Sequence, residues 1–279
     1  MPSYDTPAPI SAHLDLFVGN VTVRAGDRPT TDVEIRPTDP NDESNVRAAE
    51  QTRTEFTDGV LRIKAPRLRG WIGKKSWSVD ITLDLPAGSA MHATASMGWL
   101  TAIGTLGDCQ LKSGLGNLRL DRTAALSART VGDIRVGRIT GHAEVSSGSG
   151  EIRIGVFDGT GTVKNSNGST AIVSVTGAVT VRSSNGEIAL GDVDGGVFAR
   201  AASGAIRIER AVRGRIDAET SFGNVQVDVA EGTVAKLDLE TKFGQLDTAL
   251  ESTDGPEATD DVVTVRAHTS YGDIQLHRA

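Results

Sequence analysis

The chain has 279 residues, and 36 acidic against 29 basic side chains leave it a net charge of -7. This length excludes a small disulfide-stapled scaffold, and the acidic excess disfavours nucleic acid as the main partner. With 32 glycines and only 4% aromatic residues, the composition favours short stacked strands joined by frequent turns.

The N-terminal segment, MPSYDTPAPISAHLDLFVGN, has no basic region, no apolar run of signal-peptide length and no small-residue cleavage pattern. No stretch of the chain approaches the apolar length of a transmembrane helix. The single cysteine, Cys109, cannot form an internal disulfide. We therefore expect a cytoplasmic protein with neither a signal peptide nor a transmembrane segment.

The N-terminal third predicts strands with alternating apolar side chains at residues 13–25, 31–37, 59–66 and 77–86. A short helix is expected at residues 44–52. The end of a stack of coils exposes unpaired strand edges, and a segment of this kind would cover them. We predict that residues 1–90 form a β-rich cap continuous with the repeats that follow.

A basic and aromatic segment, RLRGWIGKKSW, lies within this cap at residues 67–77. The favoured interpretation is a hairpin whose tryptophans close the end of the stack. The alternative is an interaction surface for anionic headgroups, for an acidic patch on a partner or for sugars. Its candidate residues are Arg67, Arg69, Trp71, Lys74, Lys75 and Trp77.

From residue 91 onward a unit built around glycine recurs, as in SGSGEIRI, SSNGEIAL and TSYGDIQL. Most of these glycines follow one another at intervals of 18 residues. Glycine suits the corner of a stacked coil because it tolerates positive φ and a close backbone neighbour. The predicted corner glycines are Gly98, Gly116, Gly132, Gly150, Gly168, Gly186, Gly204, Gly223, Gly244 and Gly272.

Apolar residues recur at fixed distances after each corner glycine, as Ile134, Val136 and Val145 illustrate. Pairs of apolar residues two positions apart are typical of strands with one buried face. Coils stacked about 4.8 Å apart would pair each short strand with its equivalents above and below. The sequence therefore predicts an all-β solenoid of about 18-residue coils over residues 91–279.

Residues 251–261, ESTDGPEATDD, interrupt the repeat with acidic residues, glycine and proline. They separate the last two corner glycines, which lie 28 residues apart. We predict a solvated acidic loop inserted between two coils.

The residue before each corner glycine defines a further row along the stack. Asparagines or rings held in register often support a solenoid internally, and we expect that role here. A binding stripe is the alternative. The row comprises Met97, Leu115, Val131, Ser149, Asn167, Asn185, Ser203, Phe222, Phe243 and Tyr271.

These repeats, together with VDITLDLPAGSAMHATASMG leading into them, resemble a bacterial family of β-strand-repeat proteins often labelled putative adhesins. The resemblance covers about residues 10–279. It implies a single-stranded, right-handed β-helix-like solenoid of unknown function. It carries over no catalytic residues, because the motif of that family is structural.

An enzyme on this fold would need facing carboxylates or a bound metal. The candidates form a row after the corner glycines, comprising Asp133, Glu151, Glu187 and Asp273, beside a row of arginines. Such rows favour a solvated charge ladder, and the five histidines lack ligand spacing. We therefore predict no catalytic residues, no metal site and no cofactor.

Together these features favour a non-enzymatic structural or protein-interaction scaffold that binds a protein partner or itself. The alternative is a carbohydrate-binding or polysaccharide-degrading β-helix protein. A groove with at least two facing carboxylates would distinguish the second function from the first.

Overall fold

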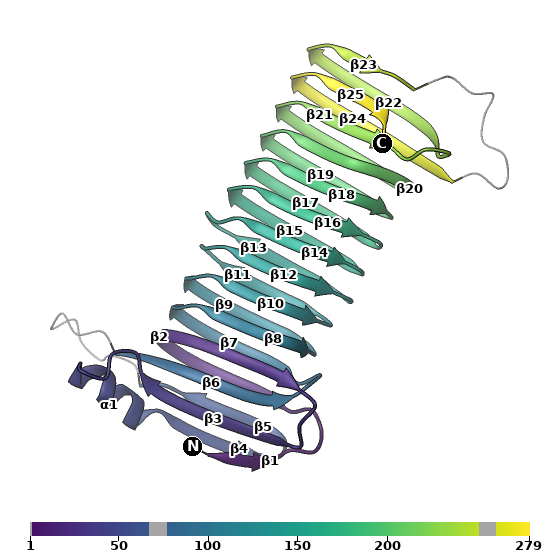
Figure 1. Cartoon of the computed structure of the whole chain (residues 1–279). Helices are drawn as coiled ribbons and strands as arrows, with labels where there is room; N and C mark the ends of the chain where they lie inside the picture. Colours follow the sequence, from purple (N-terminus) through teal and green to yellow (C-terminus); the bar gives the residue numbers. More distant parts are fainter. Residues whose placement is uncertain (1, 67–76, 251–260) are drawn as a thin grey trace. The chain divides into compact units, whose positions relative to one another are not determined.

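The computed structural model describes residues 2–66, 77–250 and 261–279 (Figure 1). The described chain is almost entirely β-strand, and the strands stack as solenoid coils, which confirms the predicted fold class. It divides into two compact units, residues 1–137 and 138–279. No helix in the described ranges is long and apolar enough to span a membrane. The separation into a cap and a solenoid at residue 90 stays a prediction.

The first unit contains the one described helix and the strands up to β12, which crosses the boundary between the units. Its elements are β1 (Ser3–Asp5), β2 (Ser11–Gly26), β3 (Thr30–Pro37), α1 (Glu43–Gln51), β4 (Arg53–Thr57), β5 (Val60–Lys64), β6 (Ser78–Pro86), β7 (Ala90–Met97), β8 (Leu100–Leu106), β9 (Cys109–Leu115), β10 (Leu118–Thr123), β11 (Leu126–Thr130) and β12 (Ile134–Ile139).

The second unit consists of the remaining strands and the turns between them. Its elements are β13 (Ala143–Ser147), β14 (Ile152–Phe157), β15 (Thr160–Asn167), β16 (Thr170–Val175), β17 (Ala178–Asn185), β18 (Ile188–Asp194), β19 (Gly196–Ser203), β20 (Ile206–Phe222), β21 (Val225–Val229), β22 (Val234–Phe243), β23 (Leu246–Thr248), β24 (Val262–Tyr271) and β25 (Ile274–Arg278).

Parallel pairing between successive coils holds the second unit together. Odd-numbered strands β13, β15, β17 and β19 pair in one row, and β14, β16 and β18 pair in another. Ile188 lies opposite Thr170 on one side and Ile206 on the other. Because side chains alternate along each strand, one set points into the coil. Ile188 and Leu190 belong to this set and are fully buried.

In the first unit, strand order in space differs from order along the chain. The long N-terminal strand β2 pairs in parallel with β5 and β6 on one side and with β7 and β8 on the other. Figure 1 shows this purple strand beside the blue strands β6 and β7. Strand β3 pairs antiparallel with both β1 and β6, and β4 pairs antiparallel with β5.

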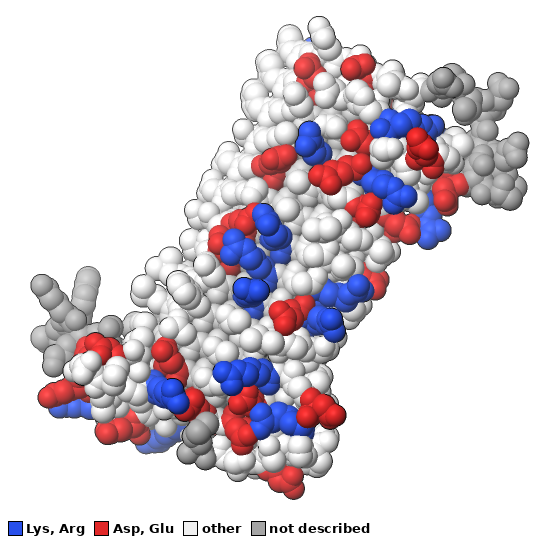
Figure 2. Space-filling view, viewed as in Figure 1, with Lys and Arg blue, Asp and Glu red and all other residues white. Residues whose placement is uncertain are grey.

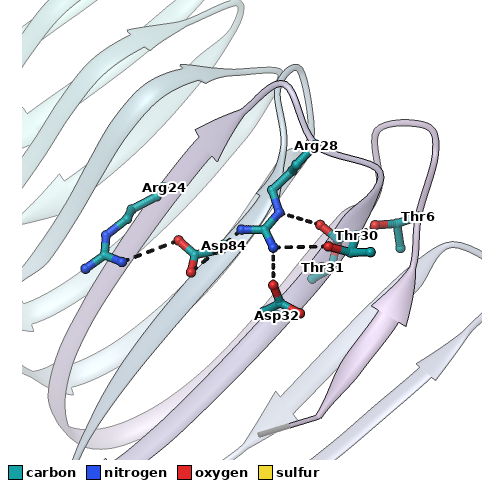
Figure 3. A network of polar contacts seen from close by, with 7 residues as sticks. All are labelled: Thr6, Arg24, Arg28, Thr30, Thr31, Asp32 and Asp84. Atoms are coloured by element: carbon teal, nitrogen blue, oxygen red, sulfur yellow. Dashed lines mark hydrogen bonds and ion pairs between the residues drawn. The ribbon is translucent and has the colours of Figure 1, made fainter.

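A polar network joins β2, β3 and β6 near the turn that follows β2 (Figure 3). The Arg28 guanidinium forms ion pairs with Asp32 and with Asp84, the second at 3.7 Å. It also donates to the Thr30 carbonyl at 2.7 Å. The Arg24 guanidinium lies 3.7 Å from the other carboxylate oxygen of Asp84, Oδ1. These contacts cross between strands and secure β2 in its inserted position.

The C-terminal strands of the second unit are likewise out of sequence order. Strand β24 pairs in parallel with β20 and with β22, and β25 pairs with β21 and with β23. Figure 1 shows the yellow strands β24 and β25 between their green neighbours. The predicted loop at residues 251–261 lies outside the described residues except for Asp261. The coil after it is therefore not the outermost coil, as sequence order suggested, but the second from the end.

Cys109 is a core residue, and its burial predicts low reactivity of the thiol. Burial raises the pKa of its thiol to about 11. The thiolate is the reactive species, and at pH 8 it would make up only about one thousandth of such a thiol. We expect a maleimide reagent to leave the folded protein unlabelled and to label it once unfolded. Labelling is measured by mass spectrometry, and rapid labelling of the native protein would contradict this expectation.

We expect His13 of β2 to make the first unit less stable in acid. Its ring stacks on His92 of β7 with centroids 4.5 Å apart, and Arg62 of β5 lies opposite on the other side. Burial lowers the pKa of His13 from its ordinary value of 6.5, and the positive charges of His92 and Arg62 lower it further by smaller amounts. The unfolded state, with an ordinary pKa near 6.5, binds more protons as the pH falls below that value. Stability is therefore lost as the pH drops through the unfolded-state pKa.

This predicts a lower free energy of unfolding at pH 5.5 than at pH 7.5, measured by urea denaturation. The variant His13→Gln removes the titrating ring, so it should lose less stability between the two pH values. An equal loss in both proteins would show that His13 does not contribute.

Candidate functional site

The structure describes only one residue of the predicted basic-aromatic surface. Trp77 is half-buried and directly precedes β6. The other candidates, Arg67, Arg69, Trp71, Lys74 and Lys75, lie outside the described residues. The choice between a closing hairpin and an interaction surface thus stays a prediction.

Corner glycines of neighbouring coils lie against one another. A Cβ atom on Gly168 would lie 2.5 Å from the carbonyl oxygen of Gly150, and one on Gly272 would lie 2.1 Å from that of Gly223. Gly244 would meet Gly272, which follows the swapped order of the coils. The row therefore runs along a single corner within each unit, although Gly132, Gly150 and Gly244 lack the positive φ expected of a corner glycine.

Two of the four carboxylates considered for catalysis lie beside cations, and a third, Asp273, accepts a hydrogen bond from the Gln245 N–H at 2.9 Å. Glu151 contacts Arg153 at 2.6 Å, and Asp133 contacts Arg135 at 3.4 Å. Figure 2 shows the same mixture of acidic and basic side chains over the face in view. Within the described ranges, no group of three or more histidine, cysteine or acidic side chains could hold a metal ion. This geometry offers a charge ladder rather than an acid and base pair.

The row before the corner glycines faces solvent, so the expected internal position is wrong, but the expected stacking is present: the Asn185 side chain donates to Asn167 Oδ1 at 3.0 Å, and the rings stack. Phe222, Tyr271 and Phe243 are 57%, 49% and 63% exposed. Tyr271 stacks between the two phenylalanines, with ring centroids 5.0 and 4.8 Å away. Parallel pairing places each ring directly beside the next, because β24 lies between β20 and β22. The result is an exposed stack of three rings that ends at Phe243.

The outermost coil of the second unit, formed by β22 and β23, is open on one side. In the described chain, β22 pairs only with β24, and β23 only with β25. Leu237 and Leu246, which point inward, are 39% and 52% exposed. Their partners one coil further in, Val265 and Ile274, are fully buried. We call the unpaired side of β22 and β23 the free edge.

Charge explains why β24 separates β20 from β22. Arg266 of β24 lies opposite Asp217 of β20 and opposite Asp238 of β22, with 3.4 Å between Arg266 and Asp238. His268 lies in the same way opposite an acidic residue on each side. Like charges directly opposite one another destabilise a sheet. Direct stacking of β22 on β20 would create three such pairs: Arg215 with Lys236, Asp217 with Asp238, and Glu219 with Glu240.

The free edge therefore combines an open strand, uncovered leucines and an exposed aromatic stack at one end of the second unit. The unpaired N–H and C=O groups of an edge strand are a template for another strand. The three rings could be found from the sequence as members of a row, but the free edge could not. Periodicity describes neighbours along the chain, whereas the free edge results from the swapped order of the last two coils.

Comparison with known proteins places this architecture in a family. The sequence matches the Toastrack family, DUF4097, over residues 18–277. The chain belongs to this family. The match confirms the resemblance drawn from the glycine repeats. No protein with a curated record matches this Toastrack chain.

Two solved structures resemble the Toastrack chain at low sequence identity. One is a putative adhesin from Bacteroides fragilis, with 13% identity and a TM-score of 0.29, covering 99% of this chain and 95% of that one. The other is a putative cell adhesion protein from Clostridium sporogenes, with 11% identity and a TM-score of 0.22, covering 99% and 94%.

Proposed function

We propose that this Toastrack protein is a non-enzymatic interaction scaffold that binds a protein partner by strand addition at the free edge. The observation that carries this proposal is the exposure of Leu237 and Leu246 on the outermost coil, which is paired on one side only in the described chain. The same inward positions are buried in the coil beneath. A strand added to β22 would satisfy its open backbone groups and cover Leu237 beside Leu246 of β23, as in other edge-strand complexes.

The carbohydrate alternative has less support from the site. Sugars stack on the faces of aromatic rings, and both faces of Tyr271 are covered by Phe222 and Phe243, so the outermost coil offers only the outer face of Phe243. The candidate carboxylates Glu151 and Asp133 contact arginines, which does not suit a general acid. Strand addition, by contrast, would involve both the unpaired side of β22 and the exposed leucines, so the site supports it better.

Site-specific photo-crosslinking in native lysate tests the proposal. A benzophenone amino acid replaces Leu246 at the free edge or, as a control, Val173, which is 60% exposed on β16. We expect a discrete crosslinked partner from position 246 alone, and its loss when Leu237→Asp is added. Equal crosslinking from both positions, or no discrete product, would contradict strand addition. Turnover in a parallel screen of glycans would instead support the enzymatic alternative.

A further inference from the structure

The partner strand can be described more closely because β24 already fits the inner side of β22. Arg266 and His268 of β24 approach the two acidic residues of β22. Arg266 lies 3.4 Å from Asp238, and His268 lies 3.8 Å from Glu240. The side chains of Asp238 and Glu240 are 67% and 63% exposed. Because they belong to β22, they also border the free edge. A strand added there would meet the same acidic pair from the other side.

The aromatic stack gives this strand a direction. Parallel, in-register pairing brought Phe222, Tyr271 and Phe243 into contact at intervals near 5 Å. Phe243 belongs to the outermost coil, so no coil in the described chain covers its outer face. A parallel strand with an aromatic residue in register would place a fourth ring there, and such ring pairs are favourable. An antiparallel strand would reverse the register along β22.

Building on the proposed function, we propose that the free edge binds a parallel strand of another protein with basic residues opposite Asp238 and Glu240. This strand alternates basic with apolar residues, and the apolar side chains cover Leu237 and Leu239. An aromatic residue opposite Phe243 extends the stack. The sequence of β24, VVTVRAHTSY, has this pattern and serves as its template.

A second copy of the chain fits this edge less well. Two-fold symmetry would pair β22 antiparallel with itself, which places the second Phe243 at the far end of the strand. Two antiparallel registers overlap most while keeping the inward side chains of both copies on one face. In these registers Asp238 would face either its own copy or Glu240. Like charges opposite one another are unfavourable. Charge complementarity therefore favours a different, basic strand.

A fluorescein-labelled peptide with the sequence of residues 261–273, DVVTVRAHTSYGD, tests the inference by anisotropy with the full chain. We expect saturable binding that weakens at least about tenfold in the double variant Asp238→Lys, Glu240→Lys, because the interaction becomes repulsive. A peptide with glutamate in place of Arg266 and His268 should show the opposite preference and bind the double variant better. The matched control, Glu144→Lys with Glu209→Lys, changes two exposed acids on other coils of the same unit and should bind like the wild type.

The charge-swapped peptide keeps the test meaningful if the double variant is less stable, since only a folded free edge can restore its binding. Replacing the peptide tyrosine with alanine should weaken binding to the wild type and have little effect in Phe243→Ala. Hydrogen exchange should show new protection in β22 and none lost from β24. Loss of protection in β24 would mean that the peptide displaces that strand and would overturn the proposal.

Two further outcomes would overturn it. One is equal binding of both peptides to both proteins. The other is a concentration-dependent dimer that disappears with Leu237→Asp, which would assign the edge to a second copy. If the crosslinking at position 246 succeeds while the charge swap fails, strand addition stands and only the basic character of the partner is wrong.

Discussion

Truncation of the chain after residue 249 should destabilise the second unit far more than removal of its outermost coil. The truncation deletes β24 and β25, which lie between two other coils. The strands β22 and β23 lose their neighbours, and docking β22 directly on β20 would place like charges opposite one another. Because Val265, Ile274 and Leu276 are fully buried, and each such side chain contributes about 1.5–3 kcal/mol, we expect a loss of about 5 kcal/mol or more.

Deleting residues 234–261 is the matched control. It removes the outermost coil and joins Thr233 directly to Val262, the residue that pairs with Val234 at the start of β22. The pairing of β24 with β20 and of β25 with β21 is kept. We expect this variant to unfold cooperatively and to stay close to the wild type in urea denaturation. Greater damage from this deletion than from the truncation would show that the coils stack in sequence order after all.

Substitution of Gly186 with alanine should strongly destabilise the second unit. Gly186 has a φ of +142°, and an added Cβ would lie 2.2 Å from the Gly168 carbonyl oxygen. These two coils would have to separate, which weakens the hydrogen bond from the Gly168 N–H to the Asn185 carbonyl, now 3.0 Å long. Backbone strain of about 1–3 kcal/mol and overpacking of about 1–3 kcal/mol together predict a loss near 4 kcal/mol.

Gly196→Ala provides the comparison, measured by the same denaturation. A Cβ there would meet only Ala178, at 3.7 Å, which is ordinary contact. It should change the free energy of unfolding by less than about 1 kcal/mol, and could raise it by restricting the unfolded chain. Similar stabilities for the two variants would show that close approach at the corner is unimportant.

Much of the coil could be predicted from sequence because its determinants are local. Spacing alone identified the strands around Ile188 and Leu190, since alternation fixes which side chains point inward. It also identified the row of glycines, because coils of equal length bring equivalent residues to the same corner. The site was less accessible to this reasoning. The rings Phe222, Phe243 and Tyr271 were found as members of a row, but their exposure was not.

By itself, therefore, the sequence determined the coil: its length, its inward apolar positions and its family. Only the tertiary structure decided the order in which coils stack, with β2 between β6 and β8 and with β24 between β20 and β22. The physical reason is that a repeat specifies which strands can pair, whereas contacts between side chains on neighbouring coils, such as the opposite charges on β20, β24 and β22, favour one order over another. Arg266 between Asp217 and Asp238 is such a choice, and it leaves β22, rather than the last strands of the chain, at the free edge.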